Sequence, residues 1–151
     1  MSQTTLLIVE KGERPDWLQS VASIFDHPKA TNAFGKIMIR QHNSNAYTGY
    51  NVSTDNTWLR LCEFDDYCLY YAIVAESGEE RVEYIKESFA SPFIILVESN
   101  NTLFIEFIIE NIDSSHAIID NDYGLLASVT QVREFIQAKI DWLHLTQIPA
   151  S

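Results

Sequence analysis

Acidic side chains that lie close together in the sequence are the first candidates for chemistry. Asp65 and Asp66 follow Glu63, and a single asparagine separates Asp120 from Asp122. Carboxylate oxygens are the ligands that Mg²⁺ and Ca²⁺ prefer in proteins. The Asp120-Asn-Asp122 triplet matches a fragment of a calcium-binding loop, but the glycine and the final glutamate of that loop are missing. Because Asp is also a common turn residue, we expect acidic turns and no metal site.

Other kinds of catalytic site find little support in the residue spacing. A nuclease would need a lysine beside its carboxylates, and Lys86 lies in a segment whose negative field would repel nucleic acid. Cys62 and Cys68 have apolar neighbours, where cysteine usually acts as a small hydrophobic residue. The five glycines are scattered, and no Cys–His zinc spacing or basic patch occurs. We therefore expect no catalytic residue, no cofactor and no binding of nucleic acid.

The net charge is confined to the middle of the chain. Residues 65–122 contain thirteen acidic and two basic residues, which gives −11, the formal charge of the whole protein. Residues 1–64 and 123–151 are each neutral. A charge distributed so unevenly attracts a basic surface and repels nucleic acid and anionic membranes. The charge pattern therefore indicates a basic protein as the partner.

Length and composition are typical of one globular domain. The chain has 151 residues, of which 46% are hydrophobic and 21% charged. No apolar run approaches the roughly 18–20 residues of a membrane helix. The N-terminal segment lacks the basic start and long apolar core of a signal peptide, and two cysteines are too few for a disulfide framework. We expect a single domain over residues 1–151 that resides in the cytoplasm and does not bind a membrane.

Hydrophobic periodicity predicts the elements that must position the acidic residues. A helix should follow Asp16, a second should follow the capping box Ser77-Gly-Glu-Glu80, and a third should be capped by Ser128 or Thr130. The run 93–97 is apolar without alternation, which indicates a central strand covered on both faces. The strands that the pattern predicts are 4–10, 34–40, 58–64, 67–75, 93–97, 103–109 and 116–119.

Two segments allow alternative interpretations. Residues 41–56 are rich in polar side chains and fit either a long loop or a solvated edge hairpin. Residues 78–90 fit a hairpin or a helix, and we favour the helix because Val82, Ile85 and Phe89 then share one face. Together the segments predict an α+β domain, in which a mixed or mainly antiparallel sheet of five to seven strands is covered by about three helices.

The helix predicted over residues 78–90 would carry a row of glutamates at i, i+4 and i+8. Like charges at this spacing repel each other by a few tenths of a kcal/mol, so the row is either a solvated face or a surface for a cationic partner. Tyrosine among carboxylates is typical of interfaces that meet arginine and lysine, although it also occurs as a half-buried sheet residue. The residues that we expect to contact a partner are Glu79, Glu83, Tyr84, Glu87, Asp113, Asp120 and Asp122.

The chain resembles the small cytosolic immunity proteins of bacterial toxin–immunity pairs, including those of contact-dependent growth inhibition. The resemblance rests on size, the α+β layout, the acidic stretch 76–122 and the absence of a catalytic constellation. It implies a protein that neutralises a cognate toxin, directed at nucleic acid, by covering a basic cleft. The resemblance covers no sequence motif of the family, so no functional residue of the family can be assigned to a position of this chain. The alternative is a small ligand-binding domain or enzyme, whose pocket between sheet and helix would contain convergent polar groups with perturbed pKa values.

Overall fold

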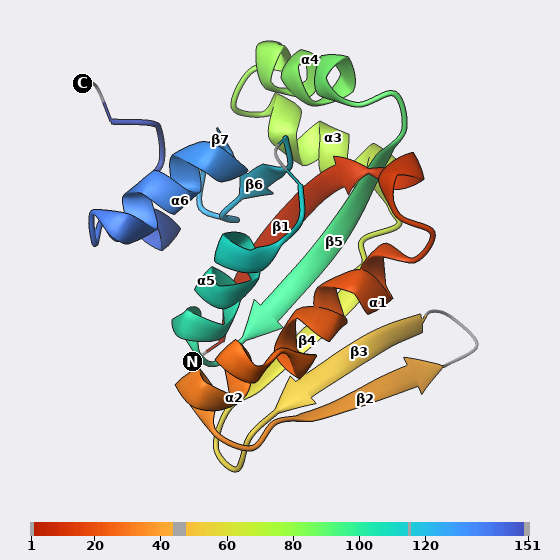
Figure 1. Cartoon of the computed structure of the whole chain (residues 1–151). Helices are drawn as coiled ribbons and strands as arrows, with labels where there is room; N and C mark the ends of the chain where they lie inside the picture. The colour runs from red at the N-terminus through yellow and green to blue at the C-terminus, as the bar shows by residue number, and fades with distance from the viewer. Residues whose placement is uncertain (1, 44–47, 115, 150–151) are drawn as a thin grey trace.

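An antiparallel sheet of seven strands forms the centre of the molecule (Figure 1). The computed structural model describes residues 2–43, 48–114 and 116–149. Within these residues the strand order is β2-β3-β4-β5-β1-β6-β7, and every neighbouring pair is antiparallel. The strands are β1 (Gln3–Glu10), β2 (Met38–Asn43), β3 (Thr48–Ser53), β4 (Trp58–Glu63), β5 (Pro92–Ser99), β6 (Ile118–Asp120) and β7 (Leu126–Ser128).

Six α-helices and three short 3-10 turns accompany the sheet in the described part of the chain. The predicted α+β class is therefore confirmed, with a sheet at the upper end of the expected size and more helices than the three expected. The helices are α1 (Trp17–Ala22), α2 (Pro28–Phe34), α3 (Tyr67–Ala75), α4 (Glu79–Ser88), α5 (Thr102–Asn111) and α6 (Val129–Gln137). The 3-10 turns are η1 (Lys11–Glu13), η2 (Ser23–Asp26) and η3 (Trp142–His144).

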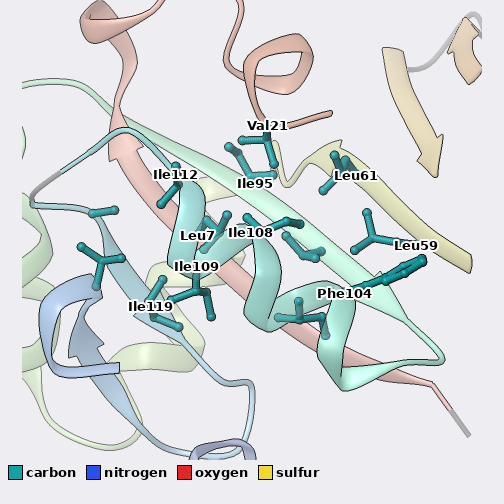
Figure 2. Close-up of a cluster of buried hydrophobic side chains, with 14 of the residues drawn as sticks. Leu7, Val21, Leu59, Leu61, Ile95, Phe104, Ile108, Ile109, Ile112 and Ile119 are labelled. Carbon is teal, nitrogen blue, oxygen red and sulfur yellow. The ribbon is translucent and has the colours of Figure 1, made fainter. Parts of the chain in front are cut away.

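The helices cover the two faces of the sheet unequally. Leu7 of β1 faces the larger apolar cluster, where Figure 2 shows it close to Ile108 of α5. That cluster also takes side chains from α1, α2 and α6. Leu6 and Ile8 of β1 belong to the smaller cluster, which contains the buried residues of α3 and α4. Both faces of β1 and β5 are covered, so the predicted central strand over 93–97 is confirmed.

Helices α3 and α4 lie together at one end of the molecule in Figure 1, away from β2 and β3. The smaller apolar cluster takes its strand residues from β1, β5, β6 and β7. The segment 41–56 forms most of a hairpin, as one of the two interpretations predicts, and β2 is the edge strand of the sheet. Residues 44–47 of this segment lie outside the described residues.

Two segments predicted as strands are helices. Residues 67–75 form α3, and residues 103–109 lie within α5. Both are largely apolar runs rich in aromatic or β-branched residues, for which propensity favours a strand and periodicity does not decide. Asp66 and Asn101 each accept a hydrogen bond from a backbone N–H in the first turn of the helix that follows. The polar residues that suggested turns are therefore N-caps.

The helix expected over residues 78–90 is present as α4, but its expected capping box is not formed. Gly78 occupies the N-cap with a φ of 135°, and no side chain there accepts a hydrogen bond from the first turn. A capping box forms instead at α6, where Ser128 and Gln131 exchange hydrogen bonds between side chain and backbone. Of the two caps considered for the last helix, Ser128 is the correct one.

Two elements have no counterpart in the sequence prediction. Helix α2 begins at Pro28, which suggests a helix stop in the sequence but occupies the first helical position, where its fixed φ is favourable. As a result β2 begins at Met38, four residues later than the strand predicted over 34–40. The other missed element, β7, is a three-residue strand that extends the sheet beyond β6.

Candidate functional site

Helix α3 is apolar on its exposed face as well as on its buried face. None of its nine residues is charged. Tyr70 and Val74 pack against the sheet, whereas the exposed fractions of Leu69 and Ile73 are 49% and 50%. Leu69 and Ile73 are four residues apart, so their side chains are neighbours on the helix surface. A helix that is hydrophobic all round is normally buried, and an exposed apolar patch marks an interaction surface.

The segment that contains α3 and α4 is strongly acidic. Residues 63–88 contain eight acidic and two basic residues, a formal charge of −6. One of the two basic side chains, Lys86, lies over the ring of Tyr71 with its ammonium 5.1 Å from the ring centroid. We name the exposed side chains of α3 and α4 the α3–α4 surface. Its members include Leu69, Ile73, Glu79, Glu80, Glu83, Tyr84 and Glu87.

A pocket of about 390 Å³ opens beside α3, between this helix, α4, the sheet and the turn that joins β6 to β7. Ile73 lines the pocket and also contributes to the exposed face of α3, so the pocket and the α3–α4 surface are continuous. The apolar lining comes from Leu6, Phe64, Val74 and Leu96, and the charged or phenolic lining comes from Tyr70, Glu76, Arg81, Asp120, Asp122 and Tyr123.

Asp120 is held inside this pocket by two hydrogen bonds. Tyr70 donates from its hydroxyl to Oδ2 at 2.8 Å, and the backbone N–H of Asp122 donates to Oδ1 at 2.9 Å. Burial raises the pKa of Asp120 above its ordinary value, although these bonds and the nearby Arg81 act in the opposite direction. Burial, followed by the charge of Asp120, also raises the pKa of Asp122. The two carboxylates are therefore more costly to keep ionised than ordinary aspartates.

Arg81 is the one guanidinium that lines the pocket, among the residues that the structure describes. Its Nη2 donates to the carbonyl oxygen of Gly124 at 2.6 Å, which ties α4 to the β6–β7 turn. Its Nε is buried and has no hydrogen-bond partner among the described residues. Burial raises the pKa of Tyr70, so this residue remains a neutral hydroxyl that donates to Asp120.

Replacing Asp120 with asparagine should remove a pH dependence of stability. Because the pKa of Asp120 is higher in the folded protein, the unfolded carboxyl ionises first as the pH rises from its ordinary value of 3.8. Between the pKa of the unfolded carboxyl and the higher pKa of the folded one, the wild-type protein should therefore lose stability relative to the Asp120→Asn variant. Above the folded pKa, the difference in unfolding free energy between the two proteins should stay constant. Urea denaturation of both proteins at a series of pH values measures it. A wild type that gains on the variant as the pH rises would contradict the assignment.

Six of the seven residues predicted to contact a partner lie in or beside the α3–α4 surface. Four are exposed on α4, where the predicted glutamate row is present with a tyrosine beside it. Two more line the pocket, one from the end of β6 and one from the β6–β7 turn. The α4 residues are Glu79, Glu83, Tyr84 and Glu87, and the pocket residues are Asp120 and Asp122.

Asp113 is separate from the other six. It follows α5, which covers the opposite face of the sheet, and it forms an ion pair with Arg14. Arg14 also donates to the backbone carbonyl of Asp113 at 3.1 Å. The acidic residues of the middle segment therefore do not all converge, and Asp113 is not part of the α3–α4 surface.

Sequence reasoning missed Leu69, Ile73 and Arg81. The first two are hidden in a run that resembles a strand, in which every second side chain would be buried. The signal that identifies them is the N-cap Asp66 followed by buried residues at helical spacing, Tyr70 and Val74. Arg81 carries no signal in the sequence, because its importance depends on the β6–β7 turn lying beside α4.

The described residues contain no group of three or more His, Cys, Asp or Glu side chains that could hold a metal ion. The acids considered from the sequence are dispersed, since Asp66 caps α3 while Asp113 and Asp120 lie on opposite sides of the sheet. Cys62 and Cys68 are free thiols. No helix among residues 2–43, 48–114 and 116–149 is long and apolar enough to cross a bilayer.

Comparison with known proteins gives no relative: no family model matches the chain, and no curated protein or solved structure is significantly similar to it. Function is therefore inferred from two features, the α3–α4 surface and the pocket that adjoins it.

Proposed function

We propose that this protein is an immunity protein that binds a cognate toxin through the α3–α4 surface and neutralises it in the cytoplasm. The observation that carries the proposal is the half-exposed apolar face of α3, formed by Leu69 and Ile73, in a segment of the chain that has an excess of acidic residues. An apolar centre with a charged rim is the usual anatomy of a protein interface. No turnover is required of such a protein, because it acts by covering the toxin in a stoichiometric complex.

The acidic rim determines which partner the surface accepts. Toxins that act on nucleic acids need basic clefts, and a negative surface is attracted to such a cleft over several ångströms. Steering of this kind brings association rates to about 10⁸–10⁹ M⁻¹s⁻¹ at low salt. The same charge disfavours nucleic acid and anionic membranes as partners. A toxin delivered by a neighbouring cell, as in contact-dependent growth inhibition, fits this requirement for fast capture.

A pull-down from the source cell at low and moderate salt tests the proposal, with the product of the adjacent gene co-expressed as the candidate partner. The expected result is one stoichiometric partner that is toxic alone and harmless when this chain is present. Recovery of no partner at any salt concentration, together with a neighbouring gene product that is harmless alone, would overturn the proposal.

Neutralising two glutamates of α4 should slow association with the toxin. In the variant with Glu79→Gln and Glu83→Gln, we expect the association rate at low salt to fall several-fold with little change in dissociation. Stability should change little, because the relief of the like-charge repulsion is offset by the loss of the favourable charge of Glu79 in the first turn of α4. Stopped-flow mixing at a series of salt concentrations measures the rates, which should converge when salt screens the field.

The matched control for this variant removes two exposed glutamates from the opposite layer. Glu110 lies on α5 and Glu134 on α6, and both side chains are exposed. The double variant Glu110→Gln and Glu134→Gln has the same net charge as the α4 variant, so a simple effect of total charge would slow both equally. Equal slowing would show that the field is not directed by α4.

A small ligand-binding domain is the second candidate, and the pocket beside α3 is the observation that favours it. The pocket has apolar walls, and burial raises the pKa values of both Asp120 and Asp122. A screen of small metabolites by thermal shift distinguishes the two functions. A ligand that stabilises the protein while no toxin partner is found would favour this candidate.

A further inference from the structure

The pocket beside α3 has the two kinds of lining that a long basic side chain requires. Leu6, Phe64, Val74 and Leu96 provide apolar walls. The hydrocarbon stem of lysine or arginine packs on such walls while its charged head seeks polar partners. The volume of about 390 Å³ lies within the range of about 300–1,000 Å³ that is usual for ligand sites.

The polar lining of the pocket has an excess of negative charge. Among the described residues that line it, Glu76, Asp120 and Asp122 are acidic and Arg81 alone is basic. The Nη2 of Arg81 is already engaged by the carbonyl of Gly124. A second cation entering the pocket would therefore meet two neighbouring carboxylates, one of them half-buried and fixed by hydrogen bonds from the Tyr70 hydroxyl and the backbone N–H of Asp122.

The position of the pocket determines the source of that cation. Ile73 belongs both to the pocket lining and to the exposed apolar face of α3. Tyr123, which also lines the pocket, is a large exposed residue at the β6–β7 turn. A protein that covers the outer face of α3 thus brings its own side chains to the mouth of the pocket.

We propose that the pocket is a specificity site that takes one lysine or arginine side chain of the partner, with the stem against the apolar walls and the charged head beside Asp120 and Asp122. The inference rests on the proposed function, because the partner that supplies the side chain is the protein bound at the α3–α4 surface. It adds a defined anchor to a surface that otherwise selects partners only by charge and apolar area. Central anchors of this kind provide much of the affinity of protein interfaces.

The test uses amino-acid amides, so it does not depend on having the toxin. N-acetyl-arginine amide and N-acetyl-lysine amide are titrated into the protein while backbone amide NMR signals are followed. N-acetyl-citrulline amide, which has nearly the same shape as the arginine probe but no charge, is the control ligand. We expect saturable shifts from both cationic probes at Tyr70, Ile73 and residues 120–124, and none from citrulline. Equal shifts from citrulline, or no localised shifts from either cation, would overturn the inference.

The variant Asp122→Asn tests the carboxylate at the mouth of the pocket. Asp122 has a φ of 57°, a left-handed conformation that asparagine adopts readily, so the variant should fold. We expect it to bind the arginine probe at least tenfold more weakly. Asp113→Asn is the matched control because it removes an exposed acid on the opposite face, and it should bind as the wild type does. A loss of the same size in both variants would point to total charge and overturn the inference.

Failure of the inference is distinguishable from failure of the proposed function. If the probes do not bind but a toxin is still captured through Leu69 and Ile73, the specificity site is wrong and the immunity function stands. If the probes bind at the pocket and no toxin is found, the immunity function fails. In that case the partner does not supply the basic side chain, and the ligand of the pocket is a free amine.

Discussion

Replacing Phe104 with alanine is expected to lower the free energy of unfolding by about 3–5 kcal/mol. Phe104 is fully buried in the larger apolar cluster, and Figure 2 shows it on α5 facing the sheet. Its ring centroid lies 5.5 Å from that of Phe25 and 4.5 Å from that of Phe34, the latter pair edge to face. The substitution therefore removes one of the two α5 rings that contact η2 and α2, the other being Phe107, and leaves a cavity that close-packed neighbours cannot fill.

Urea denaturation of the wild type and the Phe104→Ala variant measures this loss. Leu103→Ala is the control, since Leu103 is the preceding residue on the same helix and is 59% exposed. Alanine and leucine both favour helices, so the control should remain within about 0.5 kcal/mol of the wild type. A loss below about 1 kcal/mol in the Phe104→Ala variant would contradict the close packing of α5 against α2.

The second large effect concerns partner binding. Under the proposed function, replacing Leu69 and Ile73 together with glutamine should weaken the complex with the toxin by about 2–4 kcal/mol, or roughly 30- to 700-fold in affinity. Glutamine retains helix propensity and adds no charge, so the acidic field is unchanged. Because both side chains are half exposed in the free protein, the variant should fold with nearly wild-type stability. Isothermal titration with the purified toxin, together with a toxicity rescue assay, measures the loss.

Leu103 and Ile140 provide the control for the double substitution. Both are exposed large apolar residues, at 59% and 38%, and they lie on α5 and just after α6. The variant Leu103→Gln and Ile140→Gln makes the same chemical change on the opposite layer and should neutralise the toxin normally. If both double variants weaken binding alike, or if neither does, the outer face of α3 is not the docking surface.

The sequence predicts the central strand of the sheet better than it predicts helix α3, because an apolar run has more than one structural cause. The run 93–97 lies in a central strand that is covered on both faces. Its uniform apolar character is explained by this burial. The run 67–75 is equally apolar, but as α3 it leaves one face exposed. A helix with an exposed apolar face and a buried apolar strand have the same sequence pattern. For residues 67–75 the β-propensity of the side chains then favours a strand, although the segment is a helix.

The candidate site was predictable only in the part that depends on charge. The glutamate row of α4 follows from a four-residue spacing within one helix, which the sequence shows directly. The pocket depends on Leu6 of β1, Tyr70 of α3, Arg81 of α4 and Asp120 of β6 meeting at one place. These residues come from four separate elements, and only the sheet order and the docking of α3 bring them together.

The position of β1 in the sheet governs when a newly made chain can fold. Among the described strands β1 comes first in the sequence, yet it lies between β5 and β6, and Gln3 pairs with Ser99. At a synthesis rate of about 5–20 residues per second, the first of its two neighbours, β5, is made roughly 5–20 s after β1. Such long-range pairing also folds slowly once the strands are present. If the protein neutralises a toxin, the folded protein must therefore be present before the toxin arrives, because protein synthesised after toxin entry would fold too late.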